Sequence, residues 1–495
     1  MIRKFLTTVA AALTAIVSVS AYSGPSKLIP EPVDFTIGQG VYTLKPDGSD
    51  IKVYLNDASF ATKVDGLPDF AKEEAYELVI GKKGVKIYAL TKEGAFRGRQ
   101  TVEMLRLLDQ AATVQQCTIF DYPRFQHRGI MLDESRSFKG KEFVKKQIDA
   151  LALLKMNVMH LHLTDAAGWR LQIDAYPNLT DHVAWRVGET YHEWEGLGYP
   201  FTNAEDPKAY GGFYTKDDIR EIVAYAAERH IDIIPEIEMP GHSMEVNRAY
   251  PEIACVGPDG KPRPFSWDLC VGNDGTFEFL ETVLEEVIEL FPYKYIHIGG
   301  DEADFPSCPE CSSKPYSQLF LEHIKAMNET ISSLGARTMM WHDMLIERGD
   351  SRWSGFVVNG SKETATGFLQ FPRDIIICDW YYGGVKSSYP TYDYFQQQGF
   401  SVLACPWNNA DGIKAQSKYA YKVGAMGVLG TLWHHYFGNS LAKIYYALSN
   451  SMWNPETEIN ANIDHYNQQR VHHHLRQIGW DMKLKDPRHA GTYYD

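Results

Sequence analysis

The sequence predicts an α/β protein: a (β/α)8 TIM barrel preceded by a small α+β domain, a sheet with a helix on one face. Three observations support this prediction. The pattern of the chain changes near residue 121, eight apolar strand-like segments alternate with helical segments after that point, and each of the eight ends on polar or aromatic residues. We therefore expect a signal peptide over 1–21, the α+β domain over 22–121 and the barrel over 122–495.

The chain begins with the features of a signal peptide. Met1-Ile2-Arg3-Lys4 is basic, an apolar run follows from Phe5 through Val19, and small residues lead to Ala21, where we expect cleavage. An apolar run of about 15 residues is short for a membrane anchor, because a spanning helix needs roughly 20. We therefore expect the mature chain to be exported, to the periplasm or the cell exterior, and to span no membrane.

The composition indicates a packed, acidic protein. Apolar residues make up 44% of the chain and charged residues 23%, which favours a large core over disorder. The net charge of −14 argues against nucleic acid or an anionic membrane surface as a partner. The 11 Trp and 29 Tyr suit a site that binds sugars.

The first domain shows a hairpin and then a helix. Residues 76–80 and 85–89 alternate between apolar and polar across a turn that contains Gly81 and Gly84, which predicts two paired strands. Apolar residues at helical spacing follow over 94–109. No cluster of residues in this domain suggests chemistry.

The second region shows repeated strand and helix patterns. Its eight apolar segments are 129–133, 158–165, 231–238, 295–299, 338–343, 375–380, 401–406 and 427–433. Thr215-Lys216-Asp217-Asp218 resembles a capping box that begins the helix before the third segment. Eight such strand and helix units predict a closed parallel barrel.

Each predicted barrel strand ends on residues that could bind or react with a ligand. In chain order these are Asp133, Asp165, Glu238 with His242, Asp301-Glu302, Trp341-His342-Asp343, Asp379-Trp380-Tyr381, Trp407-Asn408-Asn409 and Trp433-His434-His435. Active sites of such barrels lie at the C-terminal ends of the strands, so these residues should converge on one mouth. Acids and Trp side chains together are typical of carbohydrate sites. Cleavage of a glycosidic bond needs a carboxylic acid and a second group that stabilises the sugar cation.

Seven cysteines are present, and the odd number leaves at least one thiol free in an exported chain. Cys308-Pro-Glu-Cys311 could form half of a zinc site, but a structural zinc needs more ligands and the chain has no second C-x-x-C pair. We therefore expect a local disulfide or two free thiols there, and neither a metal nor another cofactor.

Four motifs carry a resemblance to one family. His297-Ile298-Gly299-Gly300-Asp301-Glu302-Ala303 resembles the signature of glycoside hydrolase family 20, the β-N-acetylhexosaminidases. The stretches at 127–133, 160–165 and 235–243 match that family in the same order. The small N-terminal domain also resembles the one that precedes the barrel in this family, so the likeness covers nearly the whole mature chain.

The resemblance implies a retaining exo-glycosidase that removes a terminal β-linked N-acetylhexosamine, GlcNAc or GalNAc, from a glycan or glycoconjugate. Glu302 would be the general acid, and the substrate's own acetamido oxygen would attack the anomeric carbon to give an oxazolinium intermediate. Asp301 would accept the acetamido N–H. We expect an ionised Asp301 to raise the pKa of Glu302, which would suit Glu302 to hold a proton near neutral pH.

The resemblance also implies which residues bind the sugar. Arg128 would bind its O3 and O4 hydroxyls, Asp165 and His242 would lie at the floor, and the walls would be Trp341, Trp380 and Trp433. Asp133 and Arg136 are expected to form a structural ion pair.

Two departures from the family pattern concern specificity. Many members have a Tyr and an Asp after the seventh strand, where this chain has Trp407-Asn408. Tyr381, Tyr382 or Asn408 could replace the missing donor to the acetamido oxygen. Many members also have a Glu at the position of His435.

Two other functions remain open from the sequence. His160 and His162 lie on one face of a strand and could be ligands of a metal-dependent hydrolase. The protein could also be a non-catalytic or substrate-shifted sugar-binding barrel, because a fold does not guarantee its function.

Overall fold

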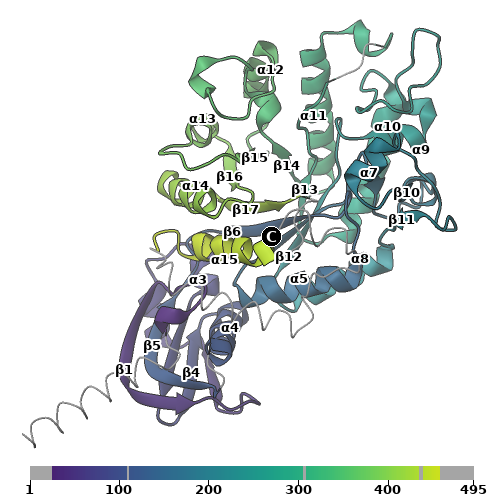
Figure 1. Cartoon of the computed structure of the whole chain (residues 1–495). Coiled ribbons are helices and arrows are strands. Elements are labelled where there is room, and N and C mark those ends of the chain that lie inside the picture. Colours follow the sequence, from purple (N-terminus) through teal and green to yellow (C-terminus); the bar gives the residue numbers. More distant parts are fainter. Residues whose placement is uncertain (1–24, 109–110, 305–307, 434–438, 458–495) are drawn as a thin grey trace, which may run out of the picture. The chain divides into compact units, whose positions relative to one another are not determined.

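The computed structural model describes residues 25–108, 111–304, 308–433 and 439–457 (Figure 1). The predicted signal peptide and His435 lie outside these residues. The described chain divides into two compact units. The first contains the described parts of Met1–Gln126, Asp149–Met156 and Gly438–Asp495, and the second contains those of His127–Ile148 and Asn157–Phe437.

The first unit is built on a five-stranded sheet with the order β1-β5-β3-β4-β2. Its strands are β1 (Asp34–Thr43), β2 (Ile51–Leu55), β3 (Tyr76–Gly81), β4 (Gly84–Ala89) and β5 (Thr113–Asp121). Strands β2 and β4 are parallel, whereas the other neighbours are antiparallel. Helix α4 (Lys92–Leu108) packs on β3 and β4, whose inward side chains are buried. Both the predicted hairpin and the predicted helix are present, and the prediction of a small α+β domain is confirmed.

A buried carboxylate joins distant segments of the first unit. Asp121, at the end of β5, accepts a hydrogen bond from the Tyr76 hydroxyl at 2.5 Å and lies 2.7 Å from Lys155 Nζ. The indole N–H of Trp453, the last residue of α15 (Asn439–Trp453), donates to the same carboxylate at 2.8 Å. A buried ion pair is tolerated only when its remaining donors and acceptors are satisfied, and this cluster satisfies them.

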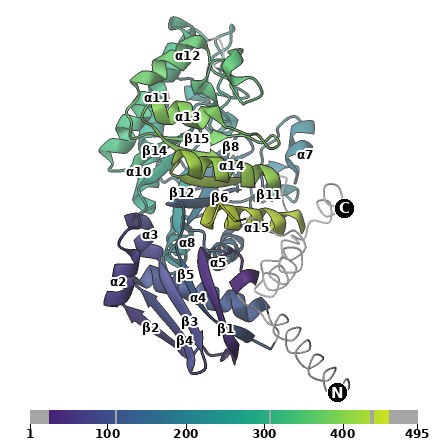
Figure 2. The same cartoon turned by 90° about the vertical axis from the view of Figure 1, so that its left-hand side faces the viewer.

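The second unit contains a closed barrel with the strand order β12-β13-β14-β15-β16-β17-β6-β7, and all neighbouring strands are parallel (Figures 1 and 2). The strands are β6 (His127–Asp133), β7 (Val158–His162), β12 (Asp232–Glu236), β13 (Tyr295–His297), β14 (Arg337–Trp341), β15 (Ile376–Trp380), β16 (Ser401–Cys405) and β17 (Gly427–Leu432). In chain order each is followed by a helix: α5 (Lys141–Leu153), α8 (Lys216–Ala227), α10 (Asp274–Leu290), α11 (Tyr316–Ser333), α12 (Lys362–Gly367), α13 (Pro390–Gln397), α14 (Ala410–Val423) and α15. The predicted (β/α)8 barrel is confirmed.

The barrel strands form because their apolar runs are buried on both faces, as is usual for a parallel sheet. Ten buried residues make one interior cluster: Met131, Val158, Ile234, Met339, Trp341, Ile376, Cys378, Leu403, Cys405 and Leu429. Helix α8 begins where the sequence predicts, because the Thr215 side chain accepts the Asp218 N–H and the Asp218 side chain accepts the Thr215 N–H. No helix in the described part of the chain is long and apolar enough to cross a bilayer.

Short elements fill the loops that connect the larger ones. In the second unit these are β8 (Thr164–Asp165), β9 (Gly168–Trp169), α6 (Asn178–Asp181), β10 (Trp185–Val187), α7 (Tyr191–Gly196), β11 (Ala209–Gly211), α9 (Met244–Ala249), η2 (Pro251–Ile253), η3 (Cys311–Ser313), η4 (Asp343–Leu345), η5 (Ser351–Trp353) and η6 (Phe368–Gln370). In the first unit they are η1 (Pro25–Lys27), α2 (Ala58–Val64) and α3 (Asp69–Glu74). The loops after β7, β12 and β13 carry most of the acidic residues of the candidate site.

Candidate active site

The two predicted catalytic carboxylates lie on the turn that follows β13. Gly299 and Gly300 have φ values of 65° and 82°, and Glu302 has a φ of 48°. A Cβ on Gly299 would lie 1.7 Å from a Glu238 carboxylate oxygen, so only glycine fits there. A left-handed conformation at a non-glycine residue costs about 1–3 kcal/mol and is typical of functional sites. The turn leaves the Glu302 side chain 51% exposed and the Asp301 side chain only 11%.

His242, on the loop after β12, connects the carboxylates of the site. It also has a left-handed backbone, with a φ of 54°. Its Nε2 lies 3.3 Å from Glu302 Oε2 and 3.8 Å from Asp301 Oδ2. Its Nδ1 lies 3.5 Å from Asp165 Oδ2 on the other side of the ring. One imidazole therefore lies among three carboxylates.

These contacts shift the protonation of the pair in opposite directions. The pKa of Asp301 is raised to about 7, first by burial and then by neighbouring carboxylates, against the opposing charge of His242. The adjacent His242 lowers the pKa of Glu302. Burial disfavours the charge on His242, but Asp165 and Asp301 outweigh it and raise the pKa of His242 well above its usual value. The expectation of a raised pKa at Glu302 is therefore wrong, because a close cation acts on Glu302 more strongly than the neighbouring aspartate.

The carboxylates open into a cavity of about 270 Å³ with aromatic walls. Its lining residues are Arg136, His242, Asp301, Glu302, Trp341, Trp380, Tyr382, Trp407 and Trp433. The Trp433 indole donates a hydrogen bond to the Tyr382 hydroxyl at 2.8 Å, which fixes two of the walls. Small-molecule sites usually measure about 300–1,000 Å³, so this volume suits one sugar ring rather than a long chain.

Asp343 supports both the turn and a wall of the cavity. It accepts the backbone N–H of Glu302 at 3.1 Å and the indole N–H of Trp380 at 3.2 Å. The Asn359 amide donates to it at 2.8 Å. The same carboxylate thus positions the proposed acid and an aromatic wall, a role that the sequence did not reveal.

The structure corrects the prediction for Arg128. Arg128 is the second residue of β6, is fully buried and does not line the cavity. At about 3.3 Å per residue it lies roughly 16 Å from the C-terminal end of its strand, where Asp133 is. A side chain near the N-terminal end of a barrel strand faces away from the active-site mouth.

Arg136 occupies the place that was predicted for Arg128. It follows the end of β6 and lines the cavity, with its guanidinium 5.2 Å from the Trp433 ring. The expected ion pair exists, since Arg136 Nη1 is 3.3 Å from Asp133 Oδ2. Nη2 lies closer still to Asp165, at 2.6 Å. The signal for this residue in the sequence was its position just beyond a predicted strand end.

Other predicted binding residues are placed both inside and outside the cavity. Tyr381 does not line it, because its ring packs against Phe356 and Tyr389 at centroid distances of 5.3 and 5.7 Å. The next residue, Tyr382, faces the cavity instead. Asn408 is exposed and outside the lining, whereas Trp407 is part of it. Asp165 is buried behind Arg136 and His242, which agrees with a supporting position at the floor.

Beneath the cavity, Glu236 on β12 gathers four donors. The His160, His162 and His297 rings lie 2.9, 2.6 and 2.9 Å from its carboxylate, and the Trp341 indole donates at 2.9 Å. The His160-x-His162 pair therefore points at a carboxylate on the neighbouring strand. This geometry makes the pair part of the floor that orients Trp341.

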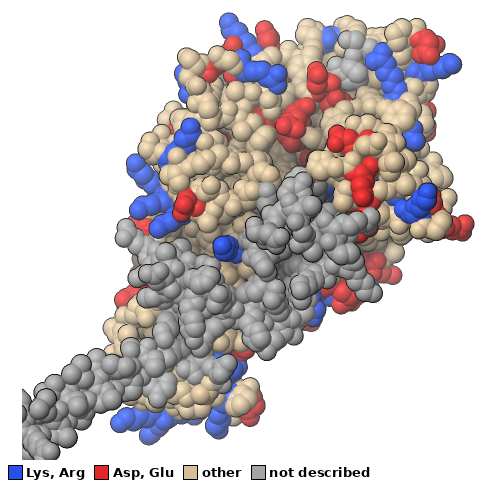
Figure 3. All heavy atoms as spheres, viewed as in Figure 1, with Lys and Arg blue, Asp and Glu red and all other residues tan. Residues whose placement is uncertain are grey.

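Acidic side chains also mark the surface around the barrel. On the face in Figure 3, red Asp and Glu side chains gather near a hollow in the upper part, and Lys and Arg lie mainly around the edge. A local excess of negative charge disfavours anionic ligands and is compatible with a neutral sugar.

A (β/α)8 barrel with a carboxylate pair and a tryptophan-walled, sugar-sized cavity at its mouth defines a class of carbohydrate site. The family model described as "Glycosyl hydrolase family 20, catalytic domain" matches residues 125–456, and "Glycosyl hydrolase family 20, domain 2" matches residues 51–122. The chain belongs to glycoside hydrolase family 20.

Individual relatives agree with this assignment. The chain is 38% identical over 299 residues to a beta-hexosaminidase of Porphyromonas gingivalis, a match that covers 55% of this chain and 36% of that protein. It is 36% identical over 288 residues to a beta-hexosaminidase of Vibrio furnissii, covering 55% of this chain and 46% of the relative. The matches thus span less than half the length of these curated relatives. A solved beta-N-acetylhexosaminidase of Bacteroides fragilis has the same fold, with a TM-score of 0.68 at 22% identity over 94% of this chain and 99% of that chain.

Proposed function

We propose that this protein is a retaining exo-glycosidase that removes a terminal β-linked N-acetylhexosamine, GlcNAc or GalNAc, from a glycan or glycoconjugate. The observation that carries this proposal is the cluster of Asp301, Glu302 and His242 at the edge of a cavity of about 270 Å³. A cavity of this size favours a terminal sugar over the middle of a chain. The relatives named beta-hexosaminidase support the choice of sugar.

The reaction proceeds in two steps with retention. Glu302 gives its proton to the glycosidic oxygen while the acetamido carbonyl oxygen of the substrate forms a bond to the anomeric carbon, and the bond to the leaving group breaks. Asp301 accepts the acetamido N–H and stabilises the positive charge of the oxazolinium. Water then attacks the anomeric carbon, gives a proton to Glu302 and reopens the ring to the acetamide.

The shifted pKa values suggest how the proton is supplied. His242, whose pKa is raised, lies 3.3 Å from Glu302, whose pKa is lowered, so the pair holds one proton that Glu302 can pass on. Asp301 must be ionised to accept an N–H, and its pKa is raised to about 7. Activity should therefore rise with pH through about 7 and fall at higher pH, where His242 loses its proton.

Arg136 and the aromatic walls supply recognition. Asp133 and Asp165 fix the guanidinium plane of Arg136 at the edge of the cavity, where its N–H donors can bind sugar hydroxyls. Tyr382 lies in the cavity and can donate to the acetamido oxygen through its hydroxyl. Trp faces bind the C–H surface of a sugar ring.

The test is an assay of the purified protein on nitrophenyl β-GlcNAc, β-GalNAc and β-glucoside, with and without a thiazoline that mimics the oxazolinium. We expect release from the N-acetyl sugars alone, inhibition by the thiazoline, and slower release in Glu302→Gln. Equal release from the β-glucoside would contradict substrate assistance. If the wild type and Glu302→Gln both bind ligand and neither turns it over, the protein is a non-catalytic sugar-binding barrel instead.

We also propose that the chain is exported, because a basic start precedes an apolar run and a small-residue pattern that ends at Ala21. N-terminal sequencing of protein recovered from the periplasm or medium of an expressing bacterium should begin at Tyr22. Recovery of the unprocessed chain in the cytosol alone would contradict export.

A further inference from the structure

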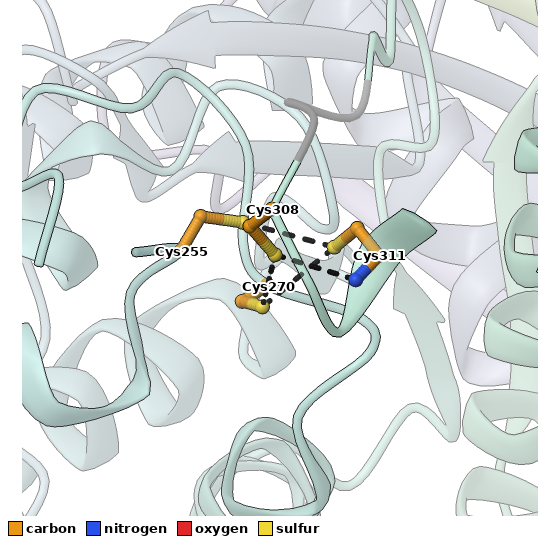
Figure 4. Close-up of side chains that lie close together, drawn as sticks. All are labelled: Cys255, Cys270, Cys308 and Cys311. Atoms are coloured by element: carbon orange, nitrogen blue, oxygen red, sulfur yellow. Dashed lines mark hydrogen bonds between the residues drawn. The ribbon is translucent and has the colours of Figure 1, made fainter. Parts of the chain in front are cut away.

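Four cysteines from two loops lie close together (Figure 4). Cys255 and Cys270 lie on the loop after β12, and Cys308 and Cys311 lie on the loop after β13. All four are buried, with at most 6% of any residue exposed. Only Cys308 and Cys311 are close together in the sequence. Closure of the barrel brings Cys255 and Cys270 next to them.

The sulfur atoms have the spacing of a tetrahedral metal site. Cys270 Sγ lies 3.6 Å from the sulfurs of both Cys308 and Cys311, and Cys255 Sγ lies 3.7 Å from that of Cys311. Zinc binds thiolate sulfur at about 2.3 Å, so four sulfurs at the corners of a tetrahedron around zinc lie about 3.8 Å apart. The observed distances match this value to within about 0.2 Å.

We propose that Cys255, Cys270, Cys308 and Cys311 bind one zinc ion as a structural site. Four thiolates leave no open position for substrate or water, which distinguishes a structural zinc from a catalytic one. Soft sulfur ligands in tetrahedral geometry select zinc or iron among the common metals, and zinc requires no redox partner. The proposal revises the expectation that the chain holds no metal.

The backbone around the sulfurs supports this site. The Cys311 N–H donates to Cys308 Sγ at 3.3 Å, as in a tight turn that directs both sulfurs to the same side. A Cβ on Gly272 would lie 2.5 Å from the carbonyl carbon of Glu310 and 2.7 Å from the Cys311 nitrogen. Only glycine allows the two loops to approach so closely, and the point of approach is the cysteine cluster.

The contacts do not favour disulfides, which are the rival in an exported chain. Cys270 is equally distant from two sulfurs, and Cys311 is almost equally distant from Cys255 and Cys270. No single pairing of the four is therefore distinguished. A shared central ion explains the equal spacing, whereas two disulfides would divide the cluster into two close pairs.

The position of the site indicates what zinc would do. The loop after β12 carries His242, and the loop after β13 carries Asp301 and Glu302. Near the cysteines the two loops are already joined, because the Asp268 side chain accepts the Asp304 N–H at 3.2 Å. A zinc ion bound by both loops would fix the position of the His242 imidazole relative to the Asp301 and Glu302 carboxylates. The four cysteines would therefore act as positioning residues.

The direct test is the metal content of the full chain, purified without chelators. Elemental analysis should find one zinc per chain, and native mass spectrometry should show that mass lost on denaturation. X-ray absorption at the zinc edge should show four sulfurs at about 2.3 Å. Absence of metal with a mass four hydrogens below that of the reduced chain would indicate two disulfides and overturn the proposal, as would the visible absorption of an iron site.

Variants separate zinc binding from other causes. Cys308→Ser and Cys270→Ser should each reduce zinc to less than a tenth of an equivalent and lower the Tm. Cys117→Ser, at a buried position of β5, is the matched control and should retain one zinc. Full zinc content in Cys308→Ser would overturn the proposal. If both variants fail to fold, the wild-type metal content and absorption spectrum still decide it.

This inference is independent of the proposed reaction. Glu302→Gln should bind one zinc with the wild-type absorption spectrum even though it lacks activity. An active wild-type protein without zinc would overturn the metal site alone, and an inactive protein with one zinc would count against the proposed reaction alone.

Discussion

Two buried carboxylates at the same barrel mouth, Glu236 and Asp301, differ in how they are bonded. Glu236 ends β12 and is surrounded by three histidines and the Trp341 indole. Burial opposes its charge, but the histidines outweigh burial and hold its pKa well below the usual value. Asp301, after the neighbouring strand β13, has a pKa raised to about 7 by burial. Its Oδ1 has no hydrogen-bond partner among the residues that the structure describes.

The difference shows that the number of hydrogen-bond donors, rather than the degree of burial, decides whether a buried carboxylate stays ionised or titrates near neutral pH. A carboxylate with several donors is a fixed charge, and Glu236 orients Trp341 as part of the floor. A carboxylate with few donors keeps an acceptor available and titrates near neutral pH, which suits a group that must bind an N–H. Five experiments test this comparison, in order of decreasing expected effect.

The largest effect is expected at Glu302, the acid beside Asp301. Glu302→Gln should lower kcat/KM by about 10³–10⁴-fold on a substrate with a sugar leaving group, because an amide cannot donate the proton. The loss should be smaller with nitrophenolate, which leaves without protonation. Glu285→Gln, on the exposed side of α10, is the control and should keep full activity. Equal losses with both leaving groups would argue against Glu302 as the acid.

Replacement of Glu236, the carboxylate that was compared with Asp301, should mainly affect stability. Glu236→Gln leaves His162 and His297 without their counter-charge and should lower the free energy of unfolding by about 3–5 kcal/mol, measured by urea denaturation at pH 6. Glu245→Gln is the matched control, since burial raises the pKa of Glu245 to about 8 and the carboxyl is already neutral at that pH. A similar cost in both variants would mean that charge has no role at Glu236.

The same cluster predicts how wild-type stability depends on pH. The pKa of His162 is raised to about 10 and that of His297 to about 9, because the charge of Glu236 outweighs the burial that opposes both. Raised folded pKa values mean that this stabilisation is complete below about 6.5 and is lost as the pH rises towards 9–10. Glu236→Gln should flatten that decline.

Asp301 should control the acid limb of the activity profile. Asp301→Asn should lower kcat/KM by about 10²–10³-fold, since the neutral amide stabilises the oxazolinium poorly. It should also remove the rise in kcat/KM through pH 7, because the group that titrates there is gone. Asp374→Asn, at an exposed position, should keep that rise. An acid limb near pH 7 that persists in Asp301→Asn would assign it to another group.

The smallest effect should distinguish the two arginines of β6 and its loop. Arg136→Lys should raise KM by about 10–100-fold, the cost of a lost charged hydrogen bond. Arg128→Lys should leave KM within about threefold and lower the Tm, since Arg128 is buried far from the cavity. The reverse result would return the sugar-binding role to Arg128.

The sequence by itself determined the barrel and the position of Asp301 and Glu302 at its mouth. Apolar runs such as 427–433 lie within two residues of the observed strands, because strand formation in a parallel barrel depends on local hydrophobic patterning. Asp301 and Glu302 could be predicted because their motif is contiguous and follows a strand whose C-terminal end must face the mouth.

Contacts between segments that are far apart in the sequence decided which other residues line the cavity, how the carboxylates titrate and where the cysteines meet. Arg136 rather than Arg128 lines the cavity because of where β6 ends, and Tyr382 rather than Tyr381 because successive residues point in opposite directions. The direction of the pKa shift of Glu302 was predicted wrongly because His242, which lowers that pKa, comes from another loop. The cysteine cluster draws on two loops in the same way. Local sequence encodes periodicity, whereas charges and thiols acquire their partners only when the barrel closes.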